Sequence, residues 1–512
     1  MLNKSKVILT ERWALVALGS VLLCLGVSGA SIWMDEASSA RVAVQPTLAT
    51  WISTLNGMQG SEPQMPGYLL YLWVWVRLFG ASEWALRLAN LPWAVLFTAS
   101  LAWGVECVLN IRRAWLIICL SPFVWFYMNE ARPYAMLMGL SMVSTIAVLA
   151  YARNQDRFRF APWWAMISLL GLWSTHMLTI TLAPSLLIFL CAMRPTSIKK
   201  IIKQWFLPVV ITLPFFSCLA IYYLRTLADG KGGIIQKPGL ANFAYAIYEL
   251  LGFGGLGPPR NVLRQSHDFH TLLPYFPGLG LGVLAFGIVT YAILRHLRHS
   301  KERWAVFELF VALAAGLLIT FAISYVVHFR LLGRHVATFF PFLALLLLAG
   351  LRADGNWHRC KLAPCALLLL GIVWSISDLR QRLLPSYEKD DYRDAAALAH
   401  IALMRGEPVL WQADREAAMY YGLRTAEVLK PGSTAPSDSL TAAYGACSLS
   451  WFRQSLQTHR AVLVVMSNKA DIFDPGGECR NTLDSLDTEH LASLSAFDVL
   501  KVTGVKSSSR QF

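Results

Sequence analysis

The chain has 512 residues, of which 56% are hydrophobic and 15% are charged, and it contains 19 tryptophans. This composition excludes a soluble protein of this size and indicates a polytopic membrane protein. The net charge of +14 does not indicate a nucleic-acid-binding protein, because the Lys and Arg residues stand in short clusters between apolar runs. Such clusters are the pattern that sets membrane topology.

The first apolar run, residues 14–33, is too long for the core of a signal peptide and has no small-residue cleavage site before Asp35. It predicts the first transmembrane helix, and the basic residues before it place the amino end in the cytoplasm. Two adjacent carboxylates, Asp35 and Glu36, follow directly on the outer side. Carboxylates at a bilayer boundary either end a span in water or serve chemistry at its mouth, so at this point both interpretations stand.

Residues 68–80 are apolar but carry Arg77 and are shorter than the roughly 20 residues that a helix needs to cross a bilayer. They predict a helix that lies in the membrane interface. Ten longer apolar runs follow: residues 85–105, 114–128, 134–151, 163–177, 178–193, 205–224, 273–294, 304–327, 336–350 and 362–377. If residues 68–80 do not cross, the basic clusters at residues 112–113, 153–159, 194–203, 295–303 and 352–361 all face the cytoplasm. The sequence therefore predicts an α-helical membrane protein with about 11 transmembrane helices, its amino end inside and its carboxyl end outside.

Beyond Asp378 the sequence mixes polar and apolar residues, with β-like runs at 408–411, 461–466 and 497–502 between helical stretches. This pattern predicts a small soluble α/β domain. We therefore expect a membrane domain at residues 1–378, with a first outer loop at 34–84 and a long outer loop at 226–272, and an extracytoplasmic α/β domain at 379–512. Cys447 and Cys479 would meet an oxidising compartment there, which favours a disulfide. Two unpaired buried thiols remain an alternative, because sequence does not supply the Cα separation.

The outer loops and span ends hold an uneven set of polar residues. Candidates for a substrate pocket are Glu62, Glu130, Tyr134 and His176. The basic residues break the positive-inside trend, and guanidinium groups present a donor fork that suits phosphate. We therefore expect a phosphate site among Arg132, Lys231, Arg260, Arg264, Arg330 and Arg334.

Simpler interpretations exist for several of these residues. Arg330 and Arg334 could reach toward lipid headgroups, and His176 could be a structural histidine. Glu130 and Arg132 could form a local ion pair. The case for a site therefore depends on carboxylates and arginines meeting on one membrane face.

A carboxylate facing arginines at the outer membrane boundary fits the transfer of a sugar from a lipid phosphate to a hydroxyl or an amine. The leaving phosphate needs fixed cations, and the nucleophile needs a base that takes its proton. The sequence has no HExxH motif, no CxxC pair and no nucleotide-binding loop. It therefore predicts no certain cofactor, and it leaves a divalent metal open.

Several short motifs carry a family resemblance. They are DEASSARVA after the first span, YLLYLWVWVRLFGASEWALRL, NEARPYAML, STHM, RHVATFFPFLALLLLAG and DDYRDAAALAH after the last span. In this order and spacing they resemble the bacterial membrane glycosyltransferases of superfamily C (GT-C), which are related to protein O-mannosyltransferases and to the lipid A aminoarabinose transferase. The resemblance implies a GT-C-type fold, a polyprenyl-phosphate sugar donor and catalysis by an acidic residue of the first outer loop.

On this resemblance Asp35 matches the family's acidic residue and is the expected general base, and Glu36 is expected to orient the acceptor or a cation. Many relatives carry His-Pro-Pro-Leu-Tyr or Glu-Lys-Pro-Pro before the interfacial helix, whereas this chain has EPQMPGY at residues 62–68. Of that segment, therefore, only Glu62 and Tyr68 are carried over as site residues.

The sequence thus predicts a transferase of the bacterial inner (plasma) membrane that moves a hexose or pentose from a polyprenyl-phosphate donor to an acceptor at the outer face. The acceptor would be a cell-envelope glycan, lipid A, another lipid or a protein. The alternatives are a transporter or flippase of lipid-linked sugars and a non-catalytic envelope assembly factor. A transporter is expected to have intramembrane charges and inverted repeats, whereas the charges here lie mostly at one face.

Overall fold

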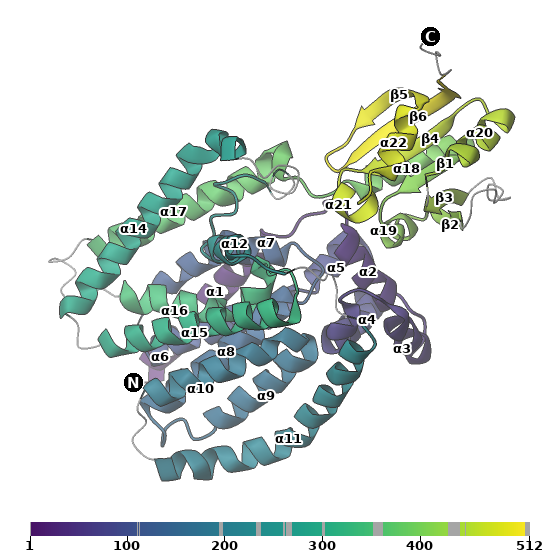
Figure 1. Ribbon diagram of the computed structural model, residues 1–512. Helices are drawn as coiled ribbons and strands as arrows, with labels where there is room; N and C mark the ends of the chain where they lie inside the picture. Colours follow the sequence, from purple (N-terminus) through teal and green to yellow (C-terminus); the bar gives the residue numbers. More distant parts are fainter. Residues whose placement is uncertain are drawn as a thin grey trace. The chain divides into compact units, whose positions relative to one another are not determined.

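A computed structural model of the chain describes residues 2–109, 111, 113–193, 198–231, 237–259, 262, 269–299, 303–351, 362–428, 441–445 and 447–506. The chain forms two compact units (Figure 1). The membrane unit consists of Met1–Ser28 and Val42–Leu383, and the C-terminal unit consists of Gly29–Arg41 and Leu384–Phe512. A short segment near the amino end, predicted as the end of the first span and the start of the first outer loop, therefore groups with the C-terminal unit.

The membrane unit is helical in its described residues. Its elements are α1 (Leu2–Cys24), α3 (Leu48–Gly57), η1 (Glu62–Gln64), α4 (Pro66–Phe79), α5 (Glu83–Leu88), α6 (Leu91–Cys107), η2 (Ala114–Leu120), α7 (Pro122–Met128), α8 (Tyr134–Arg153), α9 (Ala161–Thr175), η3 (Met177–Thr181), α10 (Leu182–Ala192), α11 (Ile198–Ala228), α12 (Leu240–Leu250), η4 (Phe269–Tyr275), α14 (Phe276–His299), α15 (Arg303–Val327), η5 (Gly333–Phe339), α16 (Phe340–Gly350) and α17 (Leu362–Leu383). Helix α2 (Met34–Ala43) begins in the C-terminal unit and ends in the membrane unit.

Seven helical stretches among the described residues are long and apolar enough to cross a membrane. They are Glu83–Cys107, Tyr134–Arg153, Ile198–Ala228, His270–Arg295, Ala305–Val327, Gly333–Gly350 and Leu362–Leu383, and they coincide with seven of the eleven predicted spans. The other four predicted spans fall on α1, on η2 with α7, on α9 and on η3 with α10. The chain is therefore a multi-pass membrane protein, and large side chains such as Phe206 and Phe215 on α11 are exposed as lipid-facing groups would be.

Helix α8 lies at the core of the membrane unit, packed against α6, α9, α10 and α16. Its side chains are buried almost continuously from Tyr134 to Tyr151. Small residues allow this close packing. At Gly139, for example, a Cβ atom would lie 2.9 Å from the carbonyl oxygen of Trp93. The helix therefore provides a fixed base for the NEARPY segment that precedes it.

The predicted interfacial helix is confirmed as a helix, α4, and its position relative to the bilayer remains a prediction. Its tyrosine and tryptophan side chains hold the neighbouring backbone: Tyr71 donates to the Ala89 carbonyl oxygen at 2.7 Å, and Trp75 donates to that of Ala85 at 2.8 Å. The Arg77 guanidinium lies 3.4 Å from the centroid of the Trp73 ring. These contacts fix α4 against α5.

The C-terminal unit contains one mixed sheet of six strands, coloured green to yellow in Figure 1. The strands are β1 (Val409–Gln412), β2 (Arg424–Val428), β3 (Thr441–Gly445), β4 (Val462–Ser467), β5 (Leu486–Ser493) and β6 (Phe497–Val505), in the order β2-β3-β1-β4-β6-β5. The first four strands in this order are parallel, whereas β6 is antiparallel to β4 and to β5. The other elements are η6 (Pro385–Tyr387), α18 (Tyr392–Met404), α19 (Arg415–Tyr420), α20 (Leu449–Thr458), α21 (Ala470–Phe473) and α22 (Glu478–Asp484).

Alternation along the strands buries both faces of this sheet. Leu410 and Val464 pack in one cluster with Phe452 of α20 and with α22. Trp411 and Phe497 instead meet the ring of Tyr392 from α18, with ring centroids 6.4 and 4.7 Å from it. The predicted α/β fold and the predicted runs at β1, β4 and β6 are thereby confirmed.

Cys447 and Cys479 form a disulfide, with Cα atoms 4.9 Å apart. The bond joins the segment before α20 to α22. It confirms the predicted pairing over the alternative of two buried thiols.

Candidate functional site

The two predicted catalytic carboxylates lie in the first turn of α2. Negative charge is favoured there by the unpaired N–H groups of the helix. Glu36 is fully buried, and its Oε2 accepts the N–H of Trp33, just before the helix, at 3.4 Å. Asp35 is partly exposed. Of the two adjacent carboxylic residues, Glu36 is therefore the one that is held inside the unit.

Residues of the C-terminal unit surround this turn. Lys389 lies with its Nζ 3.5 Å from Glu36 Oε2. Lys469 forms a buried ion pair with Asp390, and its Nζ also lies 5.7 Å from the centroid of the Trp33 ring. The acidic pair of α2 is therefore set among charged groups of the sheet domain.

Asp414 and Tyr392 interact electrostatically with Asp35. Burial raises the pKa of Asp414 to about 7. The Ala417 N–H opposes this rise, the charges of Glu416 and Asp35 add to it, and Lys469 again opposes it. Burial also raises the pKa of Tyr392 well above its ordinary value. The negative charge of Asp35 thus adds to the rise in the pKa of both neighbours.

In the membrane unit, η1 holds the second predicted group. Arg132 Nη1 donates to Glu62 Oε1 at 2.9 Å, and its Nη2 donates to Ser61 Oγ at 2.9 Å. The Arg132 and Glu62 side chains are 2% and 5% exposed. The NEARPY arginine is therefore bound to the first loop through a buried ion pair with Glu62.

Two histidines and two arginines form a third group in the same unit. The electrostatic neighbours of His176 are Arg132 and Arg334, and those of His335 are Arg334 and His176. One ring nitrogen of each histidine accepts a backbone N–H, that of Leu178 for His176 and that of Leu332 for His335. Two predicted phosphate ligands, Arg132 and Arg334, are thus brought together around His176.

Lys231 lies beside the same loop. Its Nζ donates to the Asn56 carbonyl oxygen at 2.7 Å and lies 3.5 Å from an Asp229 oxygen. Its own carbonyl oxygen accepts from Gln64 Nε2 at 3.5 Å. Lys231 therefore contacts the segment that carries Glu62.

The remaining predicted residues are placed as follows. Tyr68 is fully buried on α4, and Tyr134 begins α8 with its ring centroid 4.7 Å from that of Tyr127. Glu130 is buried, and its carbonyl oxygen accepts from Asn90 Nδ2 at 2.7 Å. Arg330 lies in the loop between α15 and η5. Arg260 and Arg264 lie outside the described residues.

Sequence reasoning missed several residues of these groups. In the membrane unit they are Ser61 and Glu249, whose Oε2 accepts the Gly333 N–H at 2.9 Å beside Arg334. In the C-terminal unit they are Lys389, Asp390, Asp414 and Lys469. The charged run Lys389-Asp390-Asp391 after the last span is visible in the sequence, but nothing in the sequence relates it to Asp35.

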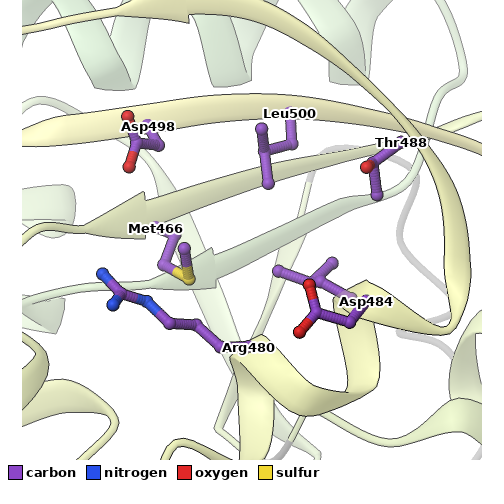
Figure 2. A pocket seen from close by; sticks show the side chains of 7 residues that line it. Met466, Arg480, Asp484, Thr488, Asp498 and Leu500 are labelled. Atoms are coloured by element: carbon purple, nitrogen blue, oxygen red, sulfur yellow. The ribbon is translucent and has the colours of Figure 1, made fainter.

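Among the described residues, no predicted site residue belongs to a metal-binding cluster or to the polar pocket of the C-terminal unit. Within the described residues no three His, Cys, Asp or Glu side chains are arranged to hold a metal ion. A pocket of about 280 Å³ lies between α22 and strands β4 to β6 (Figure 2). Its lining consists of Met466, Arg480, Leu483, Asp484, Thr488, Asp498 and Leu500, none of which was predicted as a site residue.

The sequence matches no protein-family model and no curated protein. The fold, in contrast, is similar to that of ArnT from Cupriavidus metallidurans. The apo ArnT structure has a TM-score of 0.53 and 13% identity over 98% of each chain. The structure of the same protein bound to undecaprenyl phosphate has a TM-score of 0.50 and 13% identity, and the match covers 95% of this chain and 97% of that one. At this identity the likeness establishes the fold, a GT-C-type membrane fold with a C-terminal soluble domain.

Proposed function

We propose that the chain transfers a sugar from a polyprenyl-phosphate donor to an acceptor at the outer face of the bacterial inner membrane. One observation carries the proposal: the fold follows ArnT along 98% of both chains. That protein has been solved with undecaprenyl phosphate bound. The coupled group of Arg132, His176, Arg334 and His335 supports it further, because clustered guanidinium groups suit a phosphate ligand.

The proposed reaction joins the acceptor to the sugar and releases the polyprenyl phosphate. Asp35 removes the proton of the acceptor hydroxyl or amine, and the acceptor atom forms a bond to the anomeric carbon of the sugar. The bond between that carbon and the phosphate oxygen breaks, and the oxygen keeps the electron pair. The polyprenyl phosphate thereby gains one negative charge, which needs fixed cations nearby. The proposal assigns this role to Arg132 and Arg334.

The buried Glu62–Arg132 ion pair bears on how the phosphate would be held. Arg132 uses Nη1 and Nη2 for Glu62 and Ser61. A phosphate that binds Arg132 therefore either shares the guanidinium with Glu62 or displaces it. Before the phosphate binds, Glu62 and Ser61 orient Arg132, since they accept from its two terminal nitrogens.

Replacement of Asp35 tests the proposal. Envelope glycolipids and glycans would be compared by mass spectrometry in cells with the gene, without it, and with the Asp35→Asn variant. We expect Asp35→Asn to lose the sugar-modified product, because a general base contributes about 10²- to 10⁴-fold and the amide keeps the shape of the side chain. Asp394→Asn, at an exposed position on α18 of the same unit, is the matched control and should keep the product.

The alternatives give different results. A flippase with no transferase activity would lose the product on deletion but retain it in Asp35→Asn. An assembly factor would show no consumption of lipid-linked sugar by the purified protein. Near wild-type turnover by purified Asp35→Asn would remove this residue from the mechanism.

A further inference from the structure

The sheet of the C-terminal unit has a topological switch point between β1 and β4. After β1 the chain continues to β2 and then β3 on one side, and after β4 it continues to β5 and then β6 on the other. In open α/β sheets, ligands bind in the crevice at the carboxyl ends of the two strands where the direction reverses. Here Asp414 follows β1, and Lys469 follows β4.

The chain's own segment Gly29–Arg41 lies at this edge of the sheet. Trp33 lies against Lys469, and Asp35 interacts with Asp414. Arg41, in the last turn of α2, pairs with Glu416 in the first turn of α19. The place where such a domain usually holds a ligand is therefore taken by the start of α2.

Hydrogen bonds fix the residues before α2. The Ile32 N–H donates to the Tyr421 hydroxyl oxygen at 2.7 Å, and Ile32 is fully buried. Ser31 Oγ lies 3.1 Å from the same oxygen. Arg393 donates from Nη2 to the Gly29 carbonyl oxygen at 2.6 Å and from its backbone N–H to Ser31 Oγ at 3.1 Å.

The first turn of α2 is held by charge. Glu36 is 0% exposed on its side chain, and its partner Lys389 is 15% exposed. A buried carboxylate that loses its cation is strongly destabilised in place and tends to move toward water. Because Glu36 and Asp35 share one helical turn, such a movement would carry Asp35 with it.

We propose that the C-terminal unit serves as a docking domain for the amino-terminal segment Gly29–Arg41, with Lys389 and Tyr421 as positioning residues for Asp35. The proposal rests on the proposed function for the role of Asp35, whereas the docking itself does not. It assigns the switch-point crevice an intramolecular occupant in place of a soluble ligand.

Three variants and one control test the proposal in the full-length protein reconstituted in nanodiscs. Lys389→Met removes the cation beside Glu36, Tyr421→Phe removes the hydroxyl that contacts Ile32 and Ser31, and Lys389→Arg restores the charge. Lys506→Met is the control, because Lys506 donates to the Asp484 carbonyl oxygen and has no contact with the segment in the described structure. Hydrogen exchange of residues 29–41 and transfer kinetics are measured on the same samples.

The exchange measurement needs no catalytic activity. We expect the amides of residues 29–41 to exchange roughly fivefold faster in Tyr421→Phe, the equilibrium effect of one net hydrogen bond. Lys389→Met should have an effect in the same direction, and Lys506→Met should have none. Unchanged exchange in both variants overturns the docking proposal, whatever reaction the protein performs.

The kinetic measurement tests positioning. We expect kcat to fall roughly 10- to 100-fold in Lys389→Met, as for a reacting group displaced by about an ångström, with KM for the donor within twofold of the wild type. Lys389→Arg should recover most of the loss. A merely structural role would reduce donor-binding capacity and activity in the same proportion. Faster exchange with unchanged kcat overturns the positioning role. A wild-type protein without transfer activity overturns the proposed function. In that case the docking is judged by hydrogen exchange alone.

Discussion

Asp414 gives a pH dependence of stability whose sign follows from its surroundings. It begins α19, where its Oδ1 accepts the Ala417 N–H at 2.8 Å. Burial raises its pKa from 3.8 to about 7. The folded state therefore keeps a proton that the unfolded chain releases as the pH rises above about 4. The C-terminal unit is expected to lose stability as the pH rises from about 4 to 7, and to regain it on acidification through the same range.

The magnitude follows from the size of the pKa rise. About three pKa units correspond to about 4 kcal/mol. Because Asp414 is partly exposed, solvent screening lowers this figure, and we expect about 2 kcal/mol. Asp414→Asn keeps a side chain that caps a helix well but does not titrate. The difference in the free energy of unfolding between the variant and the wild type should therefore be about 2 kcal/mol more in favour of the variant at pH 7.5 than at pH 4.

Hydrogen exchange of the β1 and β4 amides in the full-length protein, corrected for the intrinsic pH dependence, measures this difference. The quantity compared is the protection factor of Asp414→Asn divided by that of the wild type. We expect this ratio to be roughly 30-fold larger at pH 7.5 than at pH 4. Asp474→Asn is the control, because the Asp474 carboxylate accepts the N–H groups of Cys479 and Arg480 at 3.0 and 3.2 Å. Its loss should not stabilise the unit at pH 7.5. The same pH dependence in the wild type and in Asp414→Asn would refute the reasoning.

Two further predictions concern the donor and the topology. Arg132→Gln and Arg334→Gln should weaken undecaprenyl phosphate binding by roughly 10- to 100-fold, the range for a lost hydrogen bond to a charged group. Arg77→Gln, whose native side chain stacks on Trp73, should bind normally in the same native mass spectrometry titration. Equal affinity in all three variants would identify the first two arginines as structural. A membrane-impermeant thiol reagent applied to spheroplasts should label Cys447 and Cys479 only after reduction. Failure to label even the reduced and unfolded domain would place it in the cytoplasm.

The parts of the fold that the sequence predicted are those whose signal is local. Strands β1, β4 and β6 contain runs of buried apolar residues, such as VLVVMS in β4. The missed strands are β2, β3 and β5, of which β2 and β5 are the two edges of the sheet. Strand β5, with the sequence LDTEHLAS, is exposed along most of its length and shows no apolar run. An edge strand is defined by the neighbour with which it pairs, and that neighbour is not encoded in its own periodicity.

The candidate site shows the same limit. The sequence identified Glu62, Arg132, His176 and Arg334 as polar residues at one face, and the structure joins them into coupled groups in the membrane unit. It did not connect Glu36 with Lys389, which lies 353 positions away. Hydrophobic periodicity and charge clusters report on a residue's own segment, so a contact across this separation leaves no trace in them.

The contacts between the C-terminal part of the chain and Gly29–Arg41 also have a consequence for biosynthesis. The segment leaves the ribosome near the beginning of translation, whereas Lys389, Arg393 and Tyr421 are made after the last transmembrane helix. At about 5 to 20 residues per second, a separation of 353 residues leaves Glu36 without its lysine for roughly 20 to 70 seconds. The acidic turn therefore reaches its final position only when the whole chain has been inserted and the sheet has folded. A nascent or truncated chain that ends within the membrane unit would carry its proposed base in an undocked state, which links the onset of activity to completion of the chain.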